Sequence, residues 1–353
     1  MGPPERIDPK LVYLDPFLMD RARKNQGLSR KGLAAKVNVA FNTAQEMFRS
    51  GGIQPATAKR LAEAVGVRVT EVLAPWDPHF VPPAHPVGPW SPIPEWETVG
   101  YLEQGRLASN GLYYIVCRMQ HRHTPSRRGR GKFYHLSWMP QKLQERIRVL
   151  LARHPEVCAR IGSHPQIALH FSSTSAEPHG WWVIDDWCGE TTLANHLENS
   201  PWPSETLPRL LLDVARGLEA LHQSGIVFRE LAPARVLIAD KDGRAVLTDF
   251  ELAKLLDGSP SVSSEWPEDP FRAPEVDGGH VTERADLYSF GVLTAAAVAG
   301  RTPAAGEAKT ILNEAGLPKR LGNLLLKCVE PIPDRRPEGL APLLKELERW
   351  AKG

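Results

Sequence analysis

The chain has 353 residues, of which 42% are hydrophobic and 24% are charged, and its formal net charge is +2. This length allows two or three domains with a sizeable core, and the balanced charge excludes a chain that is disordered or polycationic throughout. The four cysteines show no C-x-x-C spacing and no apolar run approaches the roughly 20 residues of a membrane span, which argues against a zinc site, a disulfide scaffold and an integral membrane protein and favours a cytoplasmic one.

Residues 15–74 have the pattern of a compact set of short helices. An apolar stripe at Phe17, Leu18 and Ala22 marks the first helix, and Ser29 is placed to cap the second. After the first helix we expect helices at 29–37, 42–49, 57–65 and 70–73.

Two stretches of this set, 28–39 (LSRKGLAAKVNV) and 62–67 (AEAVGV), are similar to the Cro/Xre type of helix-turn-helix domain. In that family the second helix of the motif lies in the major groove. The resemblance implies that a domain at 1–75 binds duplex DNA through residues 15–75, and many such domains form homodimers. It places side chains toward base edges at Asn42, Thr43, Gln45 and Glu46, and toward phosphates at Arg30, Lys31 and Arg49.

One residue departs from that family's pattern, because Phe48 stands where an acidic residue is usual. A local excess of basic residues nevertheless favours an electrostatic footprint for DNA. The alternative is a solvated helical surface in a domain that contacts proteins instead.

The next segment, 76–95, is dense in proline, which predicts a semi-rigid spacer; an SH3-type ligand is the alternative reading. A β-rich lobe is expected from Trp96, with strands at 112–119, 132–138 and 181–187 and a helix at 141–152. The strongly basic segment 121–132 is interpreted as a mobile solvated insertion, or as a contact with nucleic acid or an acidic partner.

Five motifs in the second half of the chain resemble those of protein kinases in order and spacing. They are 228–235 (FRELAPAR), 249–251 (DFE), 273–275 (APE), 286–293 (DLYSFGVL) and 334–337 (DRRP). The resemblance implies an α+β bilobal kinase-like domain with an N-lobe at 96–187 and a C-lobe at 188–353. The fold class is therefore multidomain, with an all-α helix-turn-helix bundle before the bilobal domain.

The positions that carry catalysis in the family are altered here. Glu230 keeps a carboxylate for the substrate hydroxyl but is one methylene longer, and Ala232 lacks the family's lysine. Arg235 replaces a metal-binding asparagine, and a guanidinium has no acceptor atom. We expect Arg235 to pair with Asp249 and occupy the metal site; the alternative is that Arg235 faces solvent and Asp249 binds one magnesium ion. Glu251 replaces a glycine and adds a negative charge that could repel nucleotide.

The nucleotide-binding half is also weak. Gly100 and Gly105 do not keep the G-x-G-x-x-G spacing, and the expected third strand offers no lysine at its matching position. His135 lies nearest that position, Lys132 lies at the strand start, and Glu156 is the candidate acid of the C helix. We therefore expect ATP and magnesium to bind weakly or not at all, with Asp249 as a weak metal candidate.

Several other residues are expected to keep structural roles that the resemblance implies. Phe228 would stack on Phe250, Asp286 would brace the catalytic-loop backbone and Glu275 would pair with Arg336. Arg229 would grip a phosphate on the activation segment, where the candidate phosphorylation sites are Ser259, Ser261, Ser263 and Ser264. The alternative is an unmodified flexible loop.

Together these features predict a cytoplasmic protein that is not an enzyme: a pseudokinase fused to a DNA-binding domain, acting as a regulator or signalling scaffold through a protein partner. The first alternative is an atypical Ser/Thr kinase that transfers phosphate weakly, using Glu230, Asp249 and one metal ion. The second is a scaffold in which both domains contact proteins.

Overall fold

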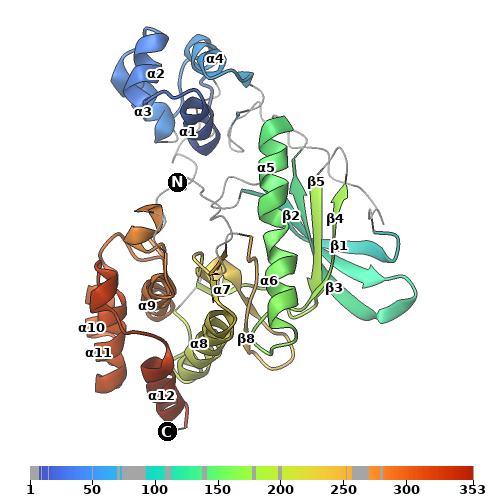
Figure 1. The fold of residues 1–353 in the computed structure, drawn as a ribbon, viewed down its shortest axis with the longest axis vertical. Helices are drawn as coiled ribbons and strands as arrows, with labels where there is room; N and C mark the ends of the chain where they lie inside the picture. Colours follow the sequence, from blue (N-terminus) through green and yellow to red (C-terminus); the bar gives the residue numbers. More distant parts are fainter. Residues whose placement is uncertain are drawn as a thin grey trace.

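The computed structural model describes residues 8, 10–14, 16–49, 51–69, 72–73, 93–107, 113–136, 141–176, 180–197, 201–251, 253–256, 270–278 and 281–352. Three of the expectations above fall outside these ranges. They are the start of the helix at 70–73, most of the proline-rich spacer, and the serines between 259 and 264. Figure 1 shows a group of N-terminal helices, a β-sheet flanked by helices, and a larger helical region.

The N-terminal helices have the expected number in the described range and nearly the expected bounds. They are α1 (Pro16–Asn25), α2 (Arg30–Lys36), α3 (Phe41–Phe48) and α4 (Pro55–Ala64). The Ser29 side chain caps α2 by accepting a hydrogen bond from the Gly32 amide. Leu33, Met47 and Leu61 are fully buried in one core between the helices. We call residues 8–73 the helical unit.

The core of the helical unit explains the departure at Phe48. This ring is buried, and the guanidinium groups of Arg23 and Arg30 lie 5.9 and 4.4 Å from its centre. Both arginines pair with Asp20 of α1, at 2.7 and 3.0 Å. Burial raises the pKa of Asp20, but its hydrogen bonds to the two arginines lower it below the usual value. Asp20 of α1 thus holds the two arginines whose guanidinium groups lie near the Phe48 ring.

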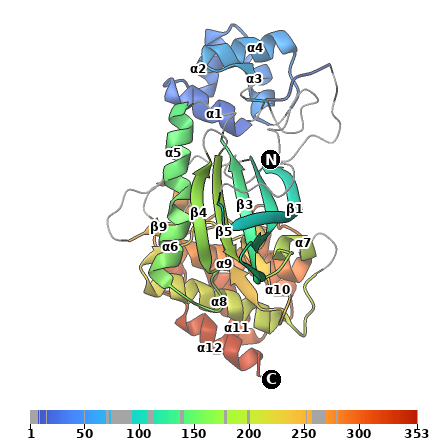
Figure 2. The same ribbon diagram turned by 90° about the vertical axis from the view of Figure 1, so that its right-hand side faces the viewer.

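The sheet lobe contains five antiparallel strands in the order β1-β2-β3-β5-β4. Their bounds are β1 (Trp96–Leu107), β2 (Tyr113–His121), β3 (Thr124–His135), β4 (His170–Ala176) and β5 (Gly180–Asp186). Alternate residues of β3 enter two cores: Phe133 packs with Trp182 on one face, and Tyr134 packs with Val183 on the other. Helices α5 (Gln141–Leu151) and α6 (Arg153–Ile161) run end to end alongside the sheet (Figures 1 and 2).

The reading of the basic segment as a mobile insertion was wrong, because residues 124–132 form most of β3 and only a tight turn separates them from β2. The alternative, a contact with nucleic acid or an acidic partner, stays a prediction. The glycines of this segment are required by packing. A Cβ at position 129 would lie 2.8 Å from Ile184 Cγ2, and one at position 131 would lie 2.6 Å from Met119 Cγ. Arg127 stacks on Phe171, with 4.0 Å between its guanidinium carbon and the ring centre. The third strand therefore begins eight residues before its predicted start.

The helical lobe packs around α9, which is apolar on nearly all sides. Its helices are α7 (Leu193–Leu197), α8 (Leu207–Gln223), α9 (Arg284–Ala299), α10 (Ala308–Glu314), α11 (Lys319–Cys328) and α12 (Ala341–Trp350). Its short strands are β6 (Ile226–Val227), β7 (Val236–Ile238), β8 (Ala245–Leu247) and β9 (Lys254–Leu255), and its 3₁₀ turns are Pro233–Arg235, Pro274–Gly278 and Pro333–Arg335. The Asp-Gly pair at 242–243 is a strong sequence signal for a hairpin, and it lies in the turn between β7 and β8, with Gly243 at φ 68°.

The segment that joins the lobes is bound closely to β7 and the turn after it. Asp240 accepts a hydrogen bond from Trp187 Nε1 at 3.1 Å and donates its own amide to the Cys188 carbonyl at 3.0 Å. A Cβ at Gly189 would lie 2.1 Å from the carbonyl oxygen of Ile238, so only glycine allows this approach. Among the helices that the structure describes, none has both the length and the apolar character that crossing a bilayer requires.

Candidate functional site

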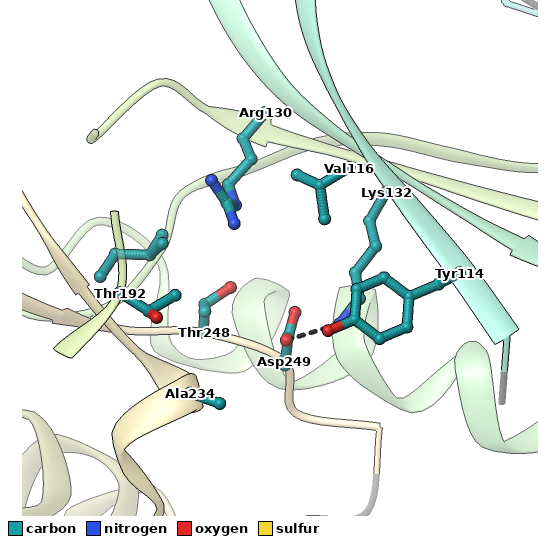
Figure 3. A pocket seen from close by; sticks show the side chains of 9 residues that line it. Tyr114, Val116, Arg130, Lys132, Thr192, Ala234, Thr248 and Asp249 are labelled. Carbon is teal, nitrogen blue, oxygen red and sulfur yellow. Dashed lines mark hydrogen bonds and ion pairs between the residues drawn. The ribbon is translucent and has the colours of Figure 1, made fainter. Parts of the chain in front are cut away.

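A small cavity of about 20 Å³ lies between the two lobes. A water molecule needs roughly 10–15 Å³, so the cavity has room for one or two waters. Figure 3 shows Arg130 and Lys132 pointing into it from the sheet lobe, and Asp249 facing Lys132 from below. The full lining consists of Tyr114, Val116, Arg130, Lys132, Thr192, Ala234, Leu237, Thr248 and Asp249.

Asp249 lies between two cations that contact the same carboxylate oxygen. Lys132 Nζ lies 2.6 Å from Asp249 Oδ2, and Arg235 Nη1 lies 2.8 Å from it. Burial raises the pKa of Asp249, but Lys132 and Arg235 outweigh this effect and lower it well below the usual value. The carboxylate is therefore ionised at neutral pH. Its residue has φ 64°, a left-handed conformation that is uncommon outside glycine.

Lys132 is a functional candidate that the sequence reading placed wrongly. Because β3 begins at Thr124, Lys132 lies well inside the strand, buried, with its ammonium 4.3 Å from the ring centre of Tyr114. Burial lowers the pKa of Lys132, whereas Asp249 and Glu251 raise it above the usual value. His135 pairs in register with Gly180 at the end of β3, and its side chain lies outside the described set. The signal that could have identified Lys132 is the alternation of side chains along a strand. Phe133 points into the core on one face of the sheet, so its neighbour Lys132 points to the opposite face.

Arg235 bridges the catalytic-loop acid and Asp249. Its Nη2 lies 3.3 Å from Glu230 Oε2, and its Nη1 lies 3.9 Å from Glu251 Oε2. Burial lowers the pKa of Arg235, while the three carboxylates around it raise it well above the usual value. The pairing with Asp249 that we expected is present, through one nitrogen. The alternative, in which Arg235 points to solvent, does not describe this structure.

Glu251 is buried, and its carboxylate faces Arg235 and not solvent. Its Oε1 accepts a hydrogen bond from the Tyr134 hydroxyl, and within the described residues its buried Oε2 has no hydrogen-bond partner. Instead of only adding a repulsive charge, Glu251 helps to balance Lys132 and Arg235. Ala232 packs at the edge of the helical-lobe core, directly before the 3₁₀ turn that carries Arg235.

The residues expected to approach phosphate from the sheet are not gathered at the cavity. Gly100 and Gly105 lie within β1, and a Cβ at Gly100 would meet nothing within 4 Å, so no close backbone approach requires glycine there. Glu156, the candidate acid of the C helix, is exposed and pairs with Arg153 and Arg160. The lysine of β3 thus has its carboxylate partner in Asp249 and not in a helix acid.

The expected structural contacts are present in the helical lobe. The rings of Phe228 and Phe250 lie 5.1 Å apart. Asp286 accepts hydrogen bonds from the amides of Phe228 and Arg229, at 2.8 and 2.7 Å, and so fixes Arg229 at φ 70°. Glu275 accepts two hydrogen bonds from Arg336, at 2.6 and 2.9 Å.

The base-edge and phosphate candidates lie on α2 and α3 of the helical unit. Asn42, Glu46 and Arg49 are exposed, while Thr43 and Gln45 are half-buried. Lys31 is exposed, whereas Arg30 is committed in part to Asp20. The unpredicted neighbour is Phe41, an exposed aromatic ring at the start of α3.

Three side chains of metal-binding type meet behind the cavity: His154, His170 and Asp185. Asp185 Oδ1 lies 3.0 Å from His154 Nε2 and 2.9 Å from His170 Nδ1. His154 Nδ1 accepts a hydrogen bond from the Phe250 amide, so in the neutral ring the proton is on Nε2. A histidine that binds a metal through Nε2 carries its proton on Nδ1, which would oppose the Phe250 N–H. The trio is therefore a hydrogen-bonded cluster.

The chain resembles known proteins in two separate regions. Residues 141–347 match the protein kinase domain, and residues 19–72 match a helix-turn-helix domain. The first match begins at α5, after the strand that carries Lys132.

Similar curated proteins include bacterial kinases. Serine/threonine-protein kinase C of Synechocystis is 25% identical over 178 residues, which cover 47% of this chain and 31% of that protein. Serine/threonine-protein kinase pkn2 of Myxococcus xanthus is 35% identical over 150 residues, covering 40% and 18%. The probable serine/threonine-protein kinase PkwA of Thermomonospora curvata is 29% identical over 213 residues, covering 57% and 28%. The chain spans less than a third of the length of each of these three relatives.

These matches correct one expectation from the sequence. The prediction that the protein is not an enzyme is wrong, because its relatives are named serine/threonine-protein kinases and the domain match points to enzyme activity. The altered catalytic positions were given too much weight relative to the domain as a whole.

Proposed function

This chain belongs to the protein kinase family, and on that premise we propose that it is an atypical serine/threonine-protein kinase that transfers phosphate weakly from ATP to protein. The observation that carries the proposal is the Lys132–Asp249 ion pair across the cleft, at 2.6 Å. It brings together a strand lysine and a metal-type carboxylate, which kinases use to hold the nucleotide phosphates and magnesium.

The residues around Asp249 fit one divalent cation. Both cations contact Asp249 through Oδ2, and Glu251 offers a buried carboxylate oxygen with no hydrogen-bond partner among the described residues. Both carboxylates lie within 4.0 Å of the same nitrogen, Arg235 Nη1. A magnesium ion held by Asp249 and Glu251 would neutralise charge on the nucleotide phosphates.

Glu230 and Arg235 would complete the reacting geometry. Glu230 would orient the substrate hydroxyl, since its carboxylate occupies the catalytic-loop position and Arg235 holds it from one side at 3.3 Å. Arg235 would supply a permanent positive charge where the family places a second metal ion. The longer Glu230 side chain can misplace the carboxylate by about 1 Å, which can cost roughly a hundredfold in rate. Slow transfer is therefore expected.

Weak nucleotide affinity is part of the proposal. Arg130 lies across the cleft, with Nη1 at 3.4 and 3.3 Å from the carbonyl oxygens of Gly189 and Glu190. A nucleotide must displace this side chain on entry, and the free energy of that step lowers the apparent affinity.

The test is phosphate incorporation from radiolabelled ATP into the protein itself and into a basic protein substrate. Asp249→Ala and Lys132→Met should each lower incorporation by roughly a hundredfold or more. Glu156→Gln is the matched control, because this exposed acid does not reach the cavity, and it should keep wild-type incorporation. Incorporation that persists at the wild-type level in Asp249→Ala would refute the proposal.

We further propose that the helical unit binds duplex DNA through α3, so that the kinase acts at or near DNA in the cytoplasm. Support comes from the helix-turn-helix match and from the exposed Lys31 and Arg49 beside the exposed face of α3. The Lys31→Ala, Arg49→Ala double variant should reduce the slope of log affinity against log salt by about 2, or about 1 for each phosphate contact. Lys345→Ala, an exposed lysine of α12, should leave the slope unchanged. A wild-type protein that does not bind random duplex DNA at low salt contradicts this proposal.

A further inference from the structure

His154 occupies a position in α6 at which three parts of the molecule meet. It lies in the first turn of the helix and is completely buried. Its Nε2 lies 3.0 Å from Asp185 Oδ1 of β5, and its Nδ1 accepts a hydrogen bond of 3.2 Å from the Phe250 amide. Its ring also stacks on the Phe250 ring, with 5.5 Å between ring centres and 17° between planes. One side chain thus joins α6, the sheet and the segment that follows Asp249.

The two ring nitrogens have different and fixed tasks. In the neutral ring Nδ1 accepts from the Phe250 N–H and Nε2 donates its proton to Asp185. Burial lowers the pKa of His154 and Asp185 raises it above the usual value, but a second proton on Nδ1 would face the Phe250 N–H, so the hydrogen-bond geometry favours the neutral ring. His170 also donates to Asp185 Oδ1, at 2.9 Å, and its ring lies edge-on to His154. The carboxylate of Asp185 therefore sets the tautomer of His154, and the tautomer sets the acceptor for the Phe250 amide.

The Phe250 amide belongs to the peptide unit that directly follows Asp249. Asp249 has the left-handed φ of 64°, and its carboxylate contacts Lys132 and Arg235. A non-glycine residue keeps such a conformation only where its surroundings hold it. In the described structure the contacts beside it include the two cations on the carboxylate, the hydrogen bond of 3.1 Å from the Thr248 amide to the Arg235 carbonyl, and His154 on the next amide.

We propose that His154 is the positioning residue for Asp249, and that it takes over the coupling between the C helix and the nucleotide site, since among the described side chains Lys132 pairs with Asp249 and not with a helix acid. The link runs from Asp185 through His154 to Phe250, whose ring continues it to Phe228 of the catalytic loop. A shift of α6 would thus act on the Phe250 amide, next to Asp249, through His154. Lys132 pairs with the Asp249 carboxylate directly. The kinetic part of this inference rests on the proposed kinase activity; the structural part does not.

The test uses two variants that each keep one of the two tasks. In His154→Asn the amide oxygen can lie where Nδ1 lies and still accept from Phe250. In His154→Gln the amide nitrogen can lie where Nε2 lies and still donate to Asp185. The full-length variants are compared by hydrogen exchange of the Phe250 amide, and by kcat and KM for ATP-dependent phosphorylation.

We expect the Phe250 amide to exchange about tenfold faster in His154→Gln than in the wild type, as for one lost buried hydrogen bond, and to stay protected in His154→Asn. We also expect kcat to fall in His154→Gln and to be largely restored in His154→Asn. His170→Ala is the matched control: it removes one hydrogen bond from Asp185 without touching Phe250, and should leave this amide protected.

Equal exchange in wild type and His154→Gln would overturn the inference. So would equal loosening in His154→Gln, His154→Asn and His170→Ala, because a general loss of packing would then explain the result. If no variant and not even the wild type transfers phosphate, the proposed function fails, but the exchange pattern still decides whether His154 holds the Asp249 backbone.

Discussion

At the scale of single residues, the centre of the molecule is a buried set of charges: two cations, Lys132 and Arg235, and three carboxylates, Glu230, Asp249 and Glu251. Buried ion pairs contribute little net stability, because removing the charges from water costs about as much as their attraction returns. Removing a single partner is costly, since the remaining charge stays buried. The set therefore constrains function more than it stabilises the fold.

A change at Arg235 should alter how many metal ions the site takes. Arg235→Asn replaces a cation with the carbonyl oxygen that the family uses as a metal ligand, and leaves three carboxylates with one cation fewer. With a non-hydrolysable ATP analogue, we expect one Mn²⁺ per protein in the wild type and two in the variant, counted by electron paramagnetic resonance. Arg244→Asn, which alters an arginine paired with Asp242 outside the cavity lining, should still give one. Equal counts in wild type and Arg235→Asn would contradict this view of Arg235.

The decrease in the free energy of unfolding at acid pH should depend on Lys132. The pKa of Asp249 is lowered from 3.8 in the folded state, so its contribution to stability is present above about pH 4 and is lost as the pH falls through the lower folded value. Lys132→Met removes the group that lowers this pKa most, so the loss should begin at higher pH. Urea unfolding between neutral and acid pH measures it, with Lys241→Met, at an exposed lysine, as control. Parallel pH curves for the wild type and Lys132→Met would contradict the assignment.

At the scale of elements, β3 shows where sequence patterns fail. Local signals, namely caps, turns and spacing, predict several elements. These are the helices at 29–37, 42–49 and 57–65, the β7–β8 hairpin and the order of the kinase-like motifs. Residues 124–132 are rich in arginine and glycine, which are typical of a loop, yet they form a strand. The glycines at 129 and 131 fit this strand because large side chains of neighbouring strands pack against them. Such a requirement arises only when distant strands pair, so it is absent from the local pattern.

The same limit applies to the site. The Arg235–Asp249 contact could be predicted because both residues stand at motif positions. The roles of Lys132 and His154 could not. The start of β3, on which the role of Lys132 depends, was misplaced, and the helix α6 that carries His154 was not among the predicted elements.

The packing of β3 gives a paired prediction with opposite signs. Gly131→Ala places a methyl group 2.6 Å from Met119 Cγ and should lower the free energy of unfolding by about 1–3 kcal/mol. Gly322→Ala, inside α11, meets nothing closer than 3.9 Å and should raise it by about 0.5–1 kcal/mol. Chemical denaturation of both variants provides the measurement. A stabilising Gly131→Ala would show that this part of β3 is a loop after all.

At the scale of the whole molecule, the helical unit has an apolar core of its own, and one apolar cluster joins the helical lobe to α6 beside the sheet. The core of the helical unit shares no residue with the others. In contrast, Val157 and Cys158 of α6 belong to the same cluster as Leu347 of α12, so the largest core extends from beside the sheet to the end of the helical lobe. We expect the two lobes to unfold together and the helical unit to unfold separately.

Calorimetry of the full chain tests this division. Arg336 is buried and donates both to Glu275 and to backbone carbonyls, so Arg336→Met should destabilise the lobes by roughly 3 kcal/mol and lower only their transition. The transition of the helical unit should keep its temperature. A single transition that moves as a whole would instead mean that the helical unit and the lobes are thermodynamically coupled.

The close approach at Gly189 has a mechanical consequence. Backbone hydrogen bonds tie Cys188 to Asp240 and Thr191 to Ile238, and Trp187 is held by its indole nitrogen. We therefore expect the segment that joins the lobes to move together with the helical lobe. A rotation of the sheet lobe would then pivot at Asp186, where β5 ends. A rotation of the sheet lobe about Asp186 would move Arg130 away from the carbonyl oxygens of Gly189 and Glu190. The same rotation would therefore open the cleft between the lobes and remove the Arg130 side chain from it.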